Sequence, residues 1–381
     1  MASPIVCVMK KNGTVRMTVN YQYLNNYTVT DAYPMPNVDD VMWRISQSTF
    51  ISCYDTTPGY WQTAMTENSA WLTSFITHRG LHEWVRSPFG LKNSGAKFVR
   101  MLQIVLQPIR DLAEAYVDDI GVHSKTWPQH ISDTIAFLTV MRKAGLTLNL
   151  KKTTFAQSEV KMVGHYVGSR KHRPDQEKLN VIQNLARPKT KTELRRASGM
   201  MGYYRAYIPN FAQAAKPLTD LTTNSTPTEI PWGNEQQQAF EYLKEAMCTS
   251  PVLKAPTFGE PFFLHTDASC YAVGCCLGQW IEGHEHPIAY SSMKLTPTQC
   301  AWATVEKEAF AVTWALQKYR DVIFGAHITV FVDHNPLTYL TASAPKSAKL
   351  TRWLLALQEY NLAIKYKRGV NNKVADYLSR L

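Results

Sequence analysis

Tyr116-Val117-Asp118-Asp119 places two adjacent acids in an otherwise apolar, strand-like run, where packing gives no reason for them. Neighbouring carboxylates repel each other, and burying them is costly unless they bind a cation. Hard oxygen ligands of this kind suit magnesium. A lone Asp-Asp pair is more often a feature of a solvated hairpin, so the interpretation depends on the sequence around it.

A third acid, Asp55, ends the β-rich run Phe50-Ile51-Ser52-Cys53-Tyr54, and the breaker Pro58-Gly59 follows it. Two metal ions roughly 3.5–4 Å apart can clamp the attacking and leaving oxygens of a phosphoryl transfer. Acids from more than one strand must converge to hold such a pair. Asp55, Asp118 and Asp119 are therefore candidate metal ligands of a polymerase.

Further short motifs surround these acids in a fixed order. They are Val15-Arg16-Met17-Thr18-Val19-Asn20-Tyr21, Gly59-Tyr60-Trp61-Gln62, Ser87-Pro88-Phe89-Gly90-Leu91-Lys92-Asn93, Val163-Gly164-His165 and Gly202-Tyr203-Tyr204-Arg205-Ala206-Tyr207-Ile208-Pro209. Their order resembles the pol polyprotein of gypsy-type (Metaviridae) LTR retrotransposons, in which a reverse transcriptase precedes a ribonuclease H. The resemblance runs nearly end to end and depends on the ordered set, because each motif alone recurs by chance.

The last third of the chain contains four further acids that only a folded domain could bring together, namely Asp267, Glu308, Asp333 and Asp376. Asp267 and Asp333 each lie at the end of a β-rich run. The family resemblance implies that the four acids hold two magnesium ions in a ribonuclease H. Each acid taken singly would be an ordinary surface or capping residue.

The position of Glu308 is selected by helix geometry together with the resemblance. It lies in a pattern from about Cys300 to Val322 that favours a helix. Glu306 is two residues away, so at about 100° per residue the two side chains point to nearly opposite sides and only one faces the strands. The family pattern of Glu followed by an apolar run favours Glu308.

Length and charge agree with a large nucleic-acid enzyme. A chain of 381 residues predicts two to three domains. Lys and Arg number 41 against 30 Asp and Glu, a formal charge of +11. A basic surface suits phosphate contacts with a polyanion, although net charge also serves solubility alone.

The cysteine spacing and the lack of long apolar runs indicate where in the cell the protein is located. The seven cysteines show no Cys-x-x-Cys spacing, which favours a reducing interior over a zinc site or a disulfide framework. No apolar run approaches the roughly 18–20 residues of a membrane helix, and the N-terminus has no signal-peptide pattern. We expect an unsecreted protein without a membrane partner, located in the cytoplasm within a virus-like particle or in the nucleus.

The resemblance implies an α+β and α/β multidomain fold, a right-hand polymerase followed by a mixed sheet with flanking helices. Residues 1–168 would form N-terminally shortened fingers and palm, 169–256 a helical thumb and connection, and 257–381 the ribonuclease H-like domain. The start at Met1 within the fingers is expected of a fragment, of a gene model cut from a longer element or of a decaying copy.

The family resemblance also implies which residues contact the substrates, from their positions in the matching motifs. Lys10 and Arg16 lie where the family meets the incoming triphosphate, a role that suits a point charge and a planar guanidinium fork. Tyr60 matches the aromatic residue under the deoxyribose that would clash with a 2′-hydroxyl, with core packing as the alternative. Gly164 lies in the hairpin that holds the primer end, where glycine permits close backbone approach.

Several positions depart from the family pattern, all of them in the polymerase half. They are Asn20, Gln22, Pro58, Gly95 and Lys97. Proline fixes φ and removes a backbone donor, so Pro58 would alter the turn that meets the triphosphate. These departures favour the alternative of a polymerase domain that no longer turns over.

The function implied is an RNA-directed DNA polymerase with ribonuclease H activity on RNA:DNA hybrids, using Mg²⁺, with Mn²⁺ as a second cation. Its partners would be an RNA template, a DNA primer, an RNA:DNA hybrid and dNTPs, with a homodimer left open. The alternative is a catalytically silent remnant that binds nucleic acid, or an enzyme that retains only the nuclease.

Overall fold

The computed structural model describes residues 2–9, 13, 15–56, 59–249, 252–333 and 348–367 of the chain. The chain divides into two compact units, residues Met1–Arg170 and Lys171–Leu381. Each unit is considered by itself below.

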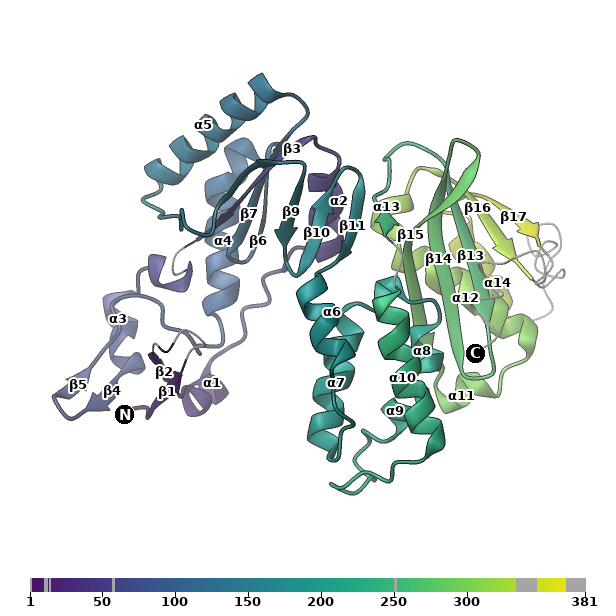
Figure 1. Cartoon of the computed structure of the whole chain (residues 1–381), viewed down its shortest axis with the longest axis horizontal. Coiled ribbons are helices and arrows are strands. Elements are labelled where there is room, and N and C mark those ends of the chain that lie inside the picture. Colours follow the sequence, from purple (N-terminus) through teal and green to yellow (C-terminus); the bar gives the residue numbers. More distant parts are fainter. Residues whose placement is uncertain are drawn as a thin grey trace. The chain divides into compact units, whose positions relative to one another are not determined.

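Unit 1 combines a small strand-rich region with a larger sheet covered by helices (Figure 1). Its strands are β1 (Ile5–Met9), β2 (Val15–Val19), β3 (Phe50–Asp55), β4 (Phe75–Thr77), β5 (Gly80–His82), β6 (Ala113–Tyr116), β7 (Asp119–Ser124), β8 (Thr154–Gln157), β9 (Glu159–Met162) and β10 (His165–Gly168). Its helices are α1 (Gln22–Tyr27), α2 (Val38–Ser46), α3 (Glu67–Ala70), α4 (Ser94–Leu106) and α5 (Trp127–Lys143), with 3₁₀ turns at η1 (Gly59–Gln62), η2 (Trp71–Thr73) and η3 (Gln107–Ile109).

The larger sheet of unit 1 has the antiparallel order β6-β7-β3-β8. Side chains alternate between its faces, as the period of two in a strand requires. Tyr54 packs with Phe98 and Phe137 of α4 and α5, while Ile51 packs on the other face with Ile45 of α2. Both faces are buried, which fixes the register of the strands that carry the acids.

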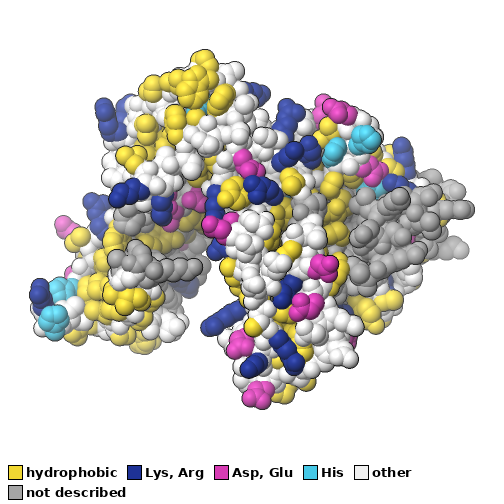
Figure 2. Space-filling model, in the orientation of Figure 1, with side chains coloured by type: hydrophobic (Ala, Val, Ile, Leu, Met, Phe, Trp, Pro, Cys, Tyr) yellow, Lys and Arg dark blue, Asp and Glu magenta, His cyan; other side chains and the backbone are white. Residues whose placement is uncertain are grey.

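The outer face of α5 carries an exposed apolar stripe, visible as yellow side chains over this helix at the top of Figure 2. Trp127, Ile131, Ile135 and Leu138 recur at helical spacing and are all exposed. The inner face of the same helix buries Phe137 and Met141 against the sheet. The helix is therefore apolar on two sides.

After a short first strand, unit 2 continues with helices and then a mixed sheet (Figure 1). The helices are α6 (Gln176–Gln183), α7 (Lys191–Tyr203), α8 (Phe211–Ala214), α9 (Lys216–Asp220), α10 (Asn234–Cys248), α11 (Pro297–Cys300), α12 (Thr304–Lys318), α13 (Arg320–Ile323) and α14 (Ala348–Leu357), with the 3₁₀ turn η4 (Arg205–Tyr207). The strands are β11 (Lys171–Pro174), β12 (Leu253–Lys254), β13 (Phe262–Ala268), β14 (Ala272–Ile281), β15 (His284–Lys294), β16 (His327–Val332) and β17 (Asn361–Tyr366).

The sheet of unit 2 has the order β15-β14-β13-β16-β17. Its first three strands are antiparallel hairpin neighbours, whereas β16 and β17 run parallel to β13. Helix α12 lies against β13 and β14, and Ala311 packs there with Val273. The mixed sheet with flanking helices confirms the predicted fold class.

The segment predicted as thumb and connection shares a core with the sheet. Side chains of α7 and α10, such as Leu194 and Met247, belong to one buried cluster with Phe263, Cys276 and Tyr290 of the strands. Asn210, in the left-handed conformation at φ 48°, is the N-cap residue of α8 and lies beside β14. The domain limits at 168/169 and 256/257 stay a prediction; the division into compact units falls between Arg170 and Lys171.

No helix among the described residues is long and apolar enough to cross a membrane.

Candidate active sites

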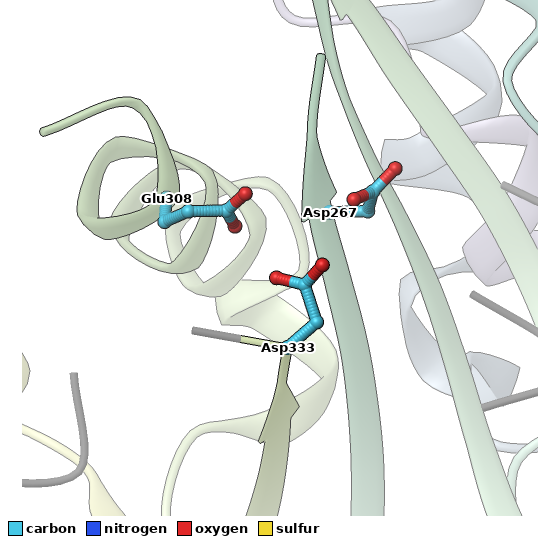
Figure 3. Close-up of side chains that lie close together, drawn as sticks. All are labelled: Asp267, Glu308 and Asp333. Carbon is cyan, nitrogen blue, oxygen red and sulfur yellow. The ribbon is translucent and has the colours of Figure 1, made fainter. Parts of the chain in front are cut away.

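Three of the four predicted nuclease acids converge in unit 2 (Figure 3). Asp267 lies near the end of β13, Asp333 follows the last residue of β16, and Glu308 lies on α12. One carboxylate oxygen from each of the three acids lies within 4.8 Å of the other two. Because β13 and β16 are parallel neighbours, acids at their carboxyl ends meet at one edge of the sheet.

The electrostatics of this cluster favour a bound cation. Burial raises the pKa of Glu308 to about 9, and the Asp333 and Asp267 carboxylates add to the rise. The Glu308 carboxyl receives a hydrogen bond from the backbone of Ala268, yet its buried Oε2 atom has no hydrogen-bond partner. A hard divalent cation satisfies three converging oxygens of this kind and removes their repulsion. The donor set thus fits magnesium or manganese.

The structure distinguishes the two glutamates of α12. Glu308 is buried, whereas Glu306 is only partly buried and pairs with Lys349 Nζ at 3.5 Å. The fourth predicted acid, Asp376, lies outside the described residues. The expected helix from Cys300 to Val322 is divided into α11, α12 and α13. Between α11 and α12, Trp302 leaves the helical path and packs against Trp353 and Phe310.

The predicted polymerase acids lie together at one end of the larger sheet of unit 1. Asp55 ends β3 and is directly opposite Asp119, the first residue of β7. Asp118 lies in the tight turn between β6 and β7, in which Val117 has φ 51°. A non-glycine residue in this left-handed region is uncommon and is held by its surroundings.

The three acids share a partly buried, repulsive environment. Burial raises the pKa of Asp118, and Asp55 and Asp119 raise it further, while Lys152 lowers it. Burial also raises the pKa of Asp119, which the backbone N–H of Val163 opposes by donating to Oδ2 at 3.3 Å. The Oδ1 atom of Asp118 is buried without a hydrogen-bond partner. This orphaned oxygen is the observation that fits a metal ligand.

The ammonium group of a lysine side chain contacts one of these acids. Lys152 Nζ lies 2.9 Å from Asp55 Oδ2. Among the described residues, the set of three with ligand atoms within 4.8 Å is the nuclease set and not this one. Lys152 is not part of the motifs that the sequence analysis singles out, and only the fold brings it to Asp55.

Gly59 is a second residue that sequence reasoning did not place in the site. A Cβ at Gly59 would lie 2.1 Å from Asp118 Oδ1. The carboxylate therefore occupies the space that any other residue would fill. The motif Gly59-Tyr60-Trp61-Gln62 includes this glycine, but the sequence alone does not identify Asp118 as the side chain that contacts it.

Of the four predicted substrate residues, the structure describes Tyr60 and Gly164 fully, but not Lys10 or the side chain of Arg16. The Tyr60 ring packs against Phe89 and Phe98, and burial followed by the Asp118 charge raises the pKa of its hydroxyl. Gly164 at φ 72° and Val163 at φ 48° form the two-residue turn between β9 and β10. Arg16 lies in β2, but its side chain is outside what the structure describes, as is the whole of Lys10.

Two family models match the chain at the regions that carry these acids. The model of the reverse transcriptase (RNA-dependent DNA polymerase) family matches residues 8–167, and that of the RNase H-like domain found in reverse transcriptase matches residues 257–360. The retrovirus-related Pol polyprotein from transposon opus of Drosophila melanogaster is 37% identical over 395 residues, which cover 100% of this chain and 39% of that protein. The chain belongs to the gypsy-type retrotransposon Pol family.

A second member of the Pol family is similar to nearly the whole chain. The Pol polyprotein from transposon gypsy of Drosophila melanogaster is 32% identical over 381 residues, covering 97% of this chain and 36% of that protein. The chain thus spans under two-fifths of the length of these relatives.

Solved structures of the foamy viral protease-reverse transcriptase share the fold of this Pol chain. One in complex with double-stranded DNA has a TM-score of 0.84 at 25% identity and covers 96% of this chain and 65% of that one. Another in complex with an RNA/DNA hybrid has a TM-score of 0.81 at 25% identity and covers 100% of this chain and 51% of that one. The reverse transcriptase and ribonuclease H-like architecture is therefore confirmed.

Proposed function

We propose that this Pol chain synthesises DNA on an RNA template and cleaves the RNA strand of the resulting hybrid. The observation that carries the proposal is the presence of two separate acidic sites at strand ends, each with a buried carboxylate oxygen that lacks a hydrogen-bond partner. Family membership and the nucleic-acid complexes of the foamy viral relatives support it.

In the polymerase, Asp55, Asp118 and Asp119 would hold two divalent cations, magnesium by preference and manganese as a substitute. Bound cations would supply positive charge to the attacking and leaving oxygens of the phosphoryl transfer. The packed Tyr60 ring would meet the deoxyribose of the dNTP, and the Gly164 turn would let the backbone approach the primer end. Lys10 and Arg16 would contact the triphosphate.

In the nuclease, Asp267, Glu308 and Asp333 would hold the cations, with Asp376 as the fourth ligand. Because these carboxylates come from two strand ends and one helix, they would hold the cations on rigid elements. The RNA:DNA hybrid would be the substrate.

A nuclease without polymerase activity is the second candidate, and one observation favours it. The nuclease acids already form a compact ligand set, whereas in the polymerase site the Lys152 ammonium contacts Asp55. Pro58, one of the departures from the family, lies outside the described residues.

Incubation with magnesium, dNTPs and a labelled RNA template annealed to a DNA primer tests both candidates on one gel. Primer extension with RNA cleavage supports the bifunctional enzyme. Cleavage without extension supports the nuclease alone, and neither product would leave a remnant that binds nucleic acid. We further propose an intracellular setting, in a cytoplasmic particle or the nucleus; a homodimer stays a prediction.

A further inference from the structure

The side chain of Gln62 joins two segments of unit 1 that flank the polymerase acids. Its Nε2 atom donates to the carbonyl oxygen of Thr147 at 3.0 Å, and its Oε1 atom accepts from the backbone N–H of Thr147 at 2.7 Å. A side-chain amide carries N–H donors and an acceptor oxygen, so it can pair with the backbone N–H and C=O of one residue as a neighbouring strand would. Both bonds have ordinary lengths.

The segment that Gln62 holds continues directly to the site. Leu148 forms a β-bridge with Thr56, and the backbone N–H of Asn149 donates to the carbonyl oxygen of Asp55 at 2.8 Å. Three residues later, Lys152 Nζ reaches Asp55 Oδ2 at 2.9 Å. The position of the ammonium group therefore depends on how this segment, residues 147–152, is anchored.

At its other end, Gln62 belongs to the turn that carries Tyr60. The carbonyl oxygen of Gln62 accepts from Arg86 Nη1 at 3.2 Å, and the Tyr60 ring is fixed by Phe89 and Phe98. This turn is thus anchored independently of residues 147–152. Gln62 ties the lysine-bearing segment to a rigid support.

The Lys152 charge acts on the whole group of acids. Its Nζ atom lies 2.9 Å from Asp55 Oδ2, and Asp55 lies directly opposite Asp119 in the sheet. Three partly buried acids without a counter-charge would repel each other and spread apart. An ammonium held at Asp55 reduces that repulsion, but it also opposes the approach of another cation.

We propose that Gln62 is a positioning residue of the polymerase site, whose amide anchors residues 147–152 so that the Lys152 ammonium stays on Asp55 when no divalent cation is bound. The inference rests on the proposed polymerase function and deepens it. Gln62 acts through Lys152 and does not itself touch the acids, so its loss should mimic the loss of Lys152.

The first experiment measures the metal-free protein. Gln62→Met keeps the side-chain length and removes both hydrogen bonds to Thr147. The acetylation rate of Lys152, followed by mass spectrometry and normalised to exposed Lys178, should rise about two- to fivefold, the range expected for losing a partly exposed ion pair. Gln157→Met is the matched control, because this exposed glutamine in β8 bonds to the nearby Phe155 carbonyl. An unchanged Lys152 rate in Gln62→Met overturns the proposal.

The second experiment is a double-mutant cycle on primer extension. Gln62→Met and Lys152→Met should each lower the half-saturating magnesium concentration by about two- to fivefold, because the competing ammonium is displaced or absent. The double variant should show no further decrease, since the two residues act as one unit. Additive effects, or reduced extension with an unchanged magnesium requirement, would show that Gln62 is merely structural.

The two experiments separate this inference from the proposed function. If the unaltered chain fails to extend a primer, the polymerase proposal fails, but the acetylation rate still tests the anchor. RNA cleavage by unit 2 reports whether each variant is folded and active elsewhere. Extension with no change at Lys152 would refute the anchor alone.

Discussion

The Asp118 carboxylate lies in the space beside Gly59, where a Cβ would come within 2.1 Å of Asp118 Oδ1. This contact is far closer than van der Waals distance, so a side chain at position 59 must displace the acid. Asp118 in turn lies in a left-handed turn with Val117, and little freedom remains for it to move without disturbing β6 and β7.

Gly59→Ala should therefore reduce primer extension by at least about 100-fold, the loss that follows a displacement of about 1 Å at a reacting centre. RNA cleavage should stay unchanged, because the nuclease acids lie in unit 2. Gly199→Ala is the control, since a Cβ on this helical glycine meets no atom within 4 Å. Normal extension by Gly59→Ala would mean that Asp118 is not needed where the structure places it.

Replacing one acid in each site should separate the two activities. Asp267→Asn should abolish RNA cleavage and leave extension intact, because the neutral amide removes one of three converging anionic ligands. Asp119→Asn should do the reverse. Both variants are nearly isosteric, and both products can be followed on one gel. Cleavage that persists in Asp267→Asn would remove the nuclease assignment.

The features of the sites that could be predicted are those that depend on short stretches of sequence, such as strand ends and helix faces. Asp55 was expected at the end of a strand, and β3 ends there; the alternation of Ile51 and Tyr54 between faces follows from the same pattern. Helix geometry allows only one of Glu306 and Glu308 to face the strands, and the family pattern favours Glu308.

The unpredicted part depends on tertiary contacts. Lys152 reaches Asp55 across 97 residues of sequence, and no spacing rule connects them. The helix expected from Cys300 to Val322 is interrupted between α11 and α12, where Trp302 packs against Trp353 of α14. Likewise, the helices before β13 could be foreseen, but not that Met247 and Tyr290 would share one core.

The stability of the metal-free protein should fall as pH rises. The pKa of Glu308 is about 9 in the folded state, against an ordinary value of 4.5. Between these values the folded state holds a proton that the unfolded state has lost, so each increase in pH favours unfolding by at most about 1.4 kcal/mol per unit. Below pH 4.5 the carboxyl is neutral in both states and the penalty vanishes.

Urea unfolding in EDTA across this pH range tests the linkage. Glu308→Gln cannot ionise and should remove this part of the slope, so the difference between the two proteins should grow toward high pH. Excess magnesium should reduce the same slope in the unaltered protein, because a bound cation stabilises the ionised carboxyl. Parallel curves for the two proteins would show that Glu308 is not the group responsible.

The packing of helices α6–α10 on the nuclease sheet can be tested at one contact. A Cβ on Gly274 of β14 would lie 2.2 Å from Oδ1 of Asn210, the N-cap residue of α8. Gly274→Ala should therefore destabilise unit 2 by about 1–3 kcal/mol, the usual cost of forcing extra volume into a packed interior. Hydrogen exchange of the β13–β14 amides measures the loss within this unit.

The compensating change is Asn210→Gly, which removes the obstructing side chain and suits the φ of 48° at that position. The double variant Gly274→Ala with Asn210→Gly should recover most of the lost protection, and Asn210→Gly alone should change it little. Recovery requires that the two positions interact directly. If the double variant is as unstable as Gly274→Ala, the steric contact with Asn210 is not the cause, and the α8 end does not pack on β14 as the structure has it.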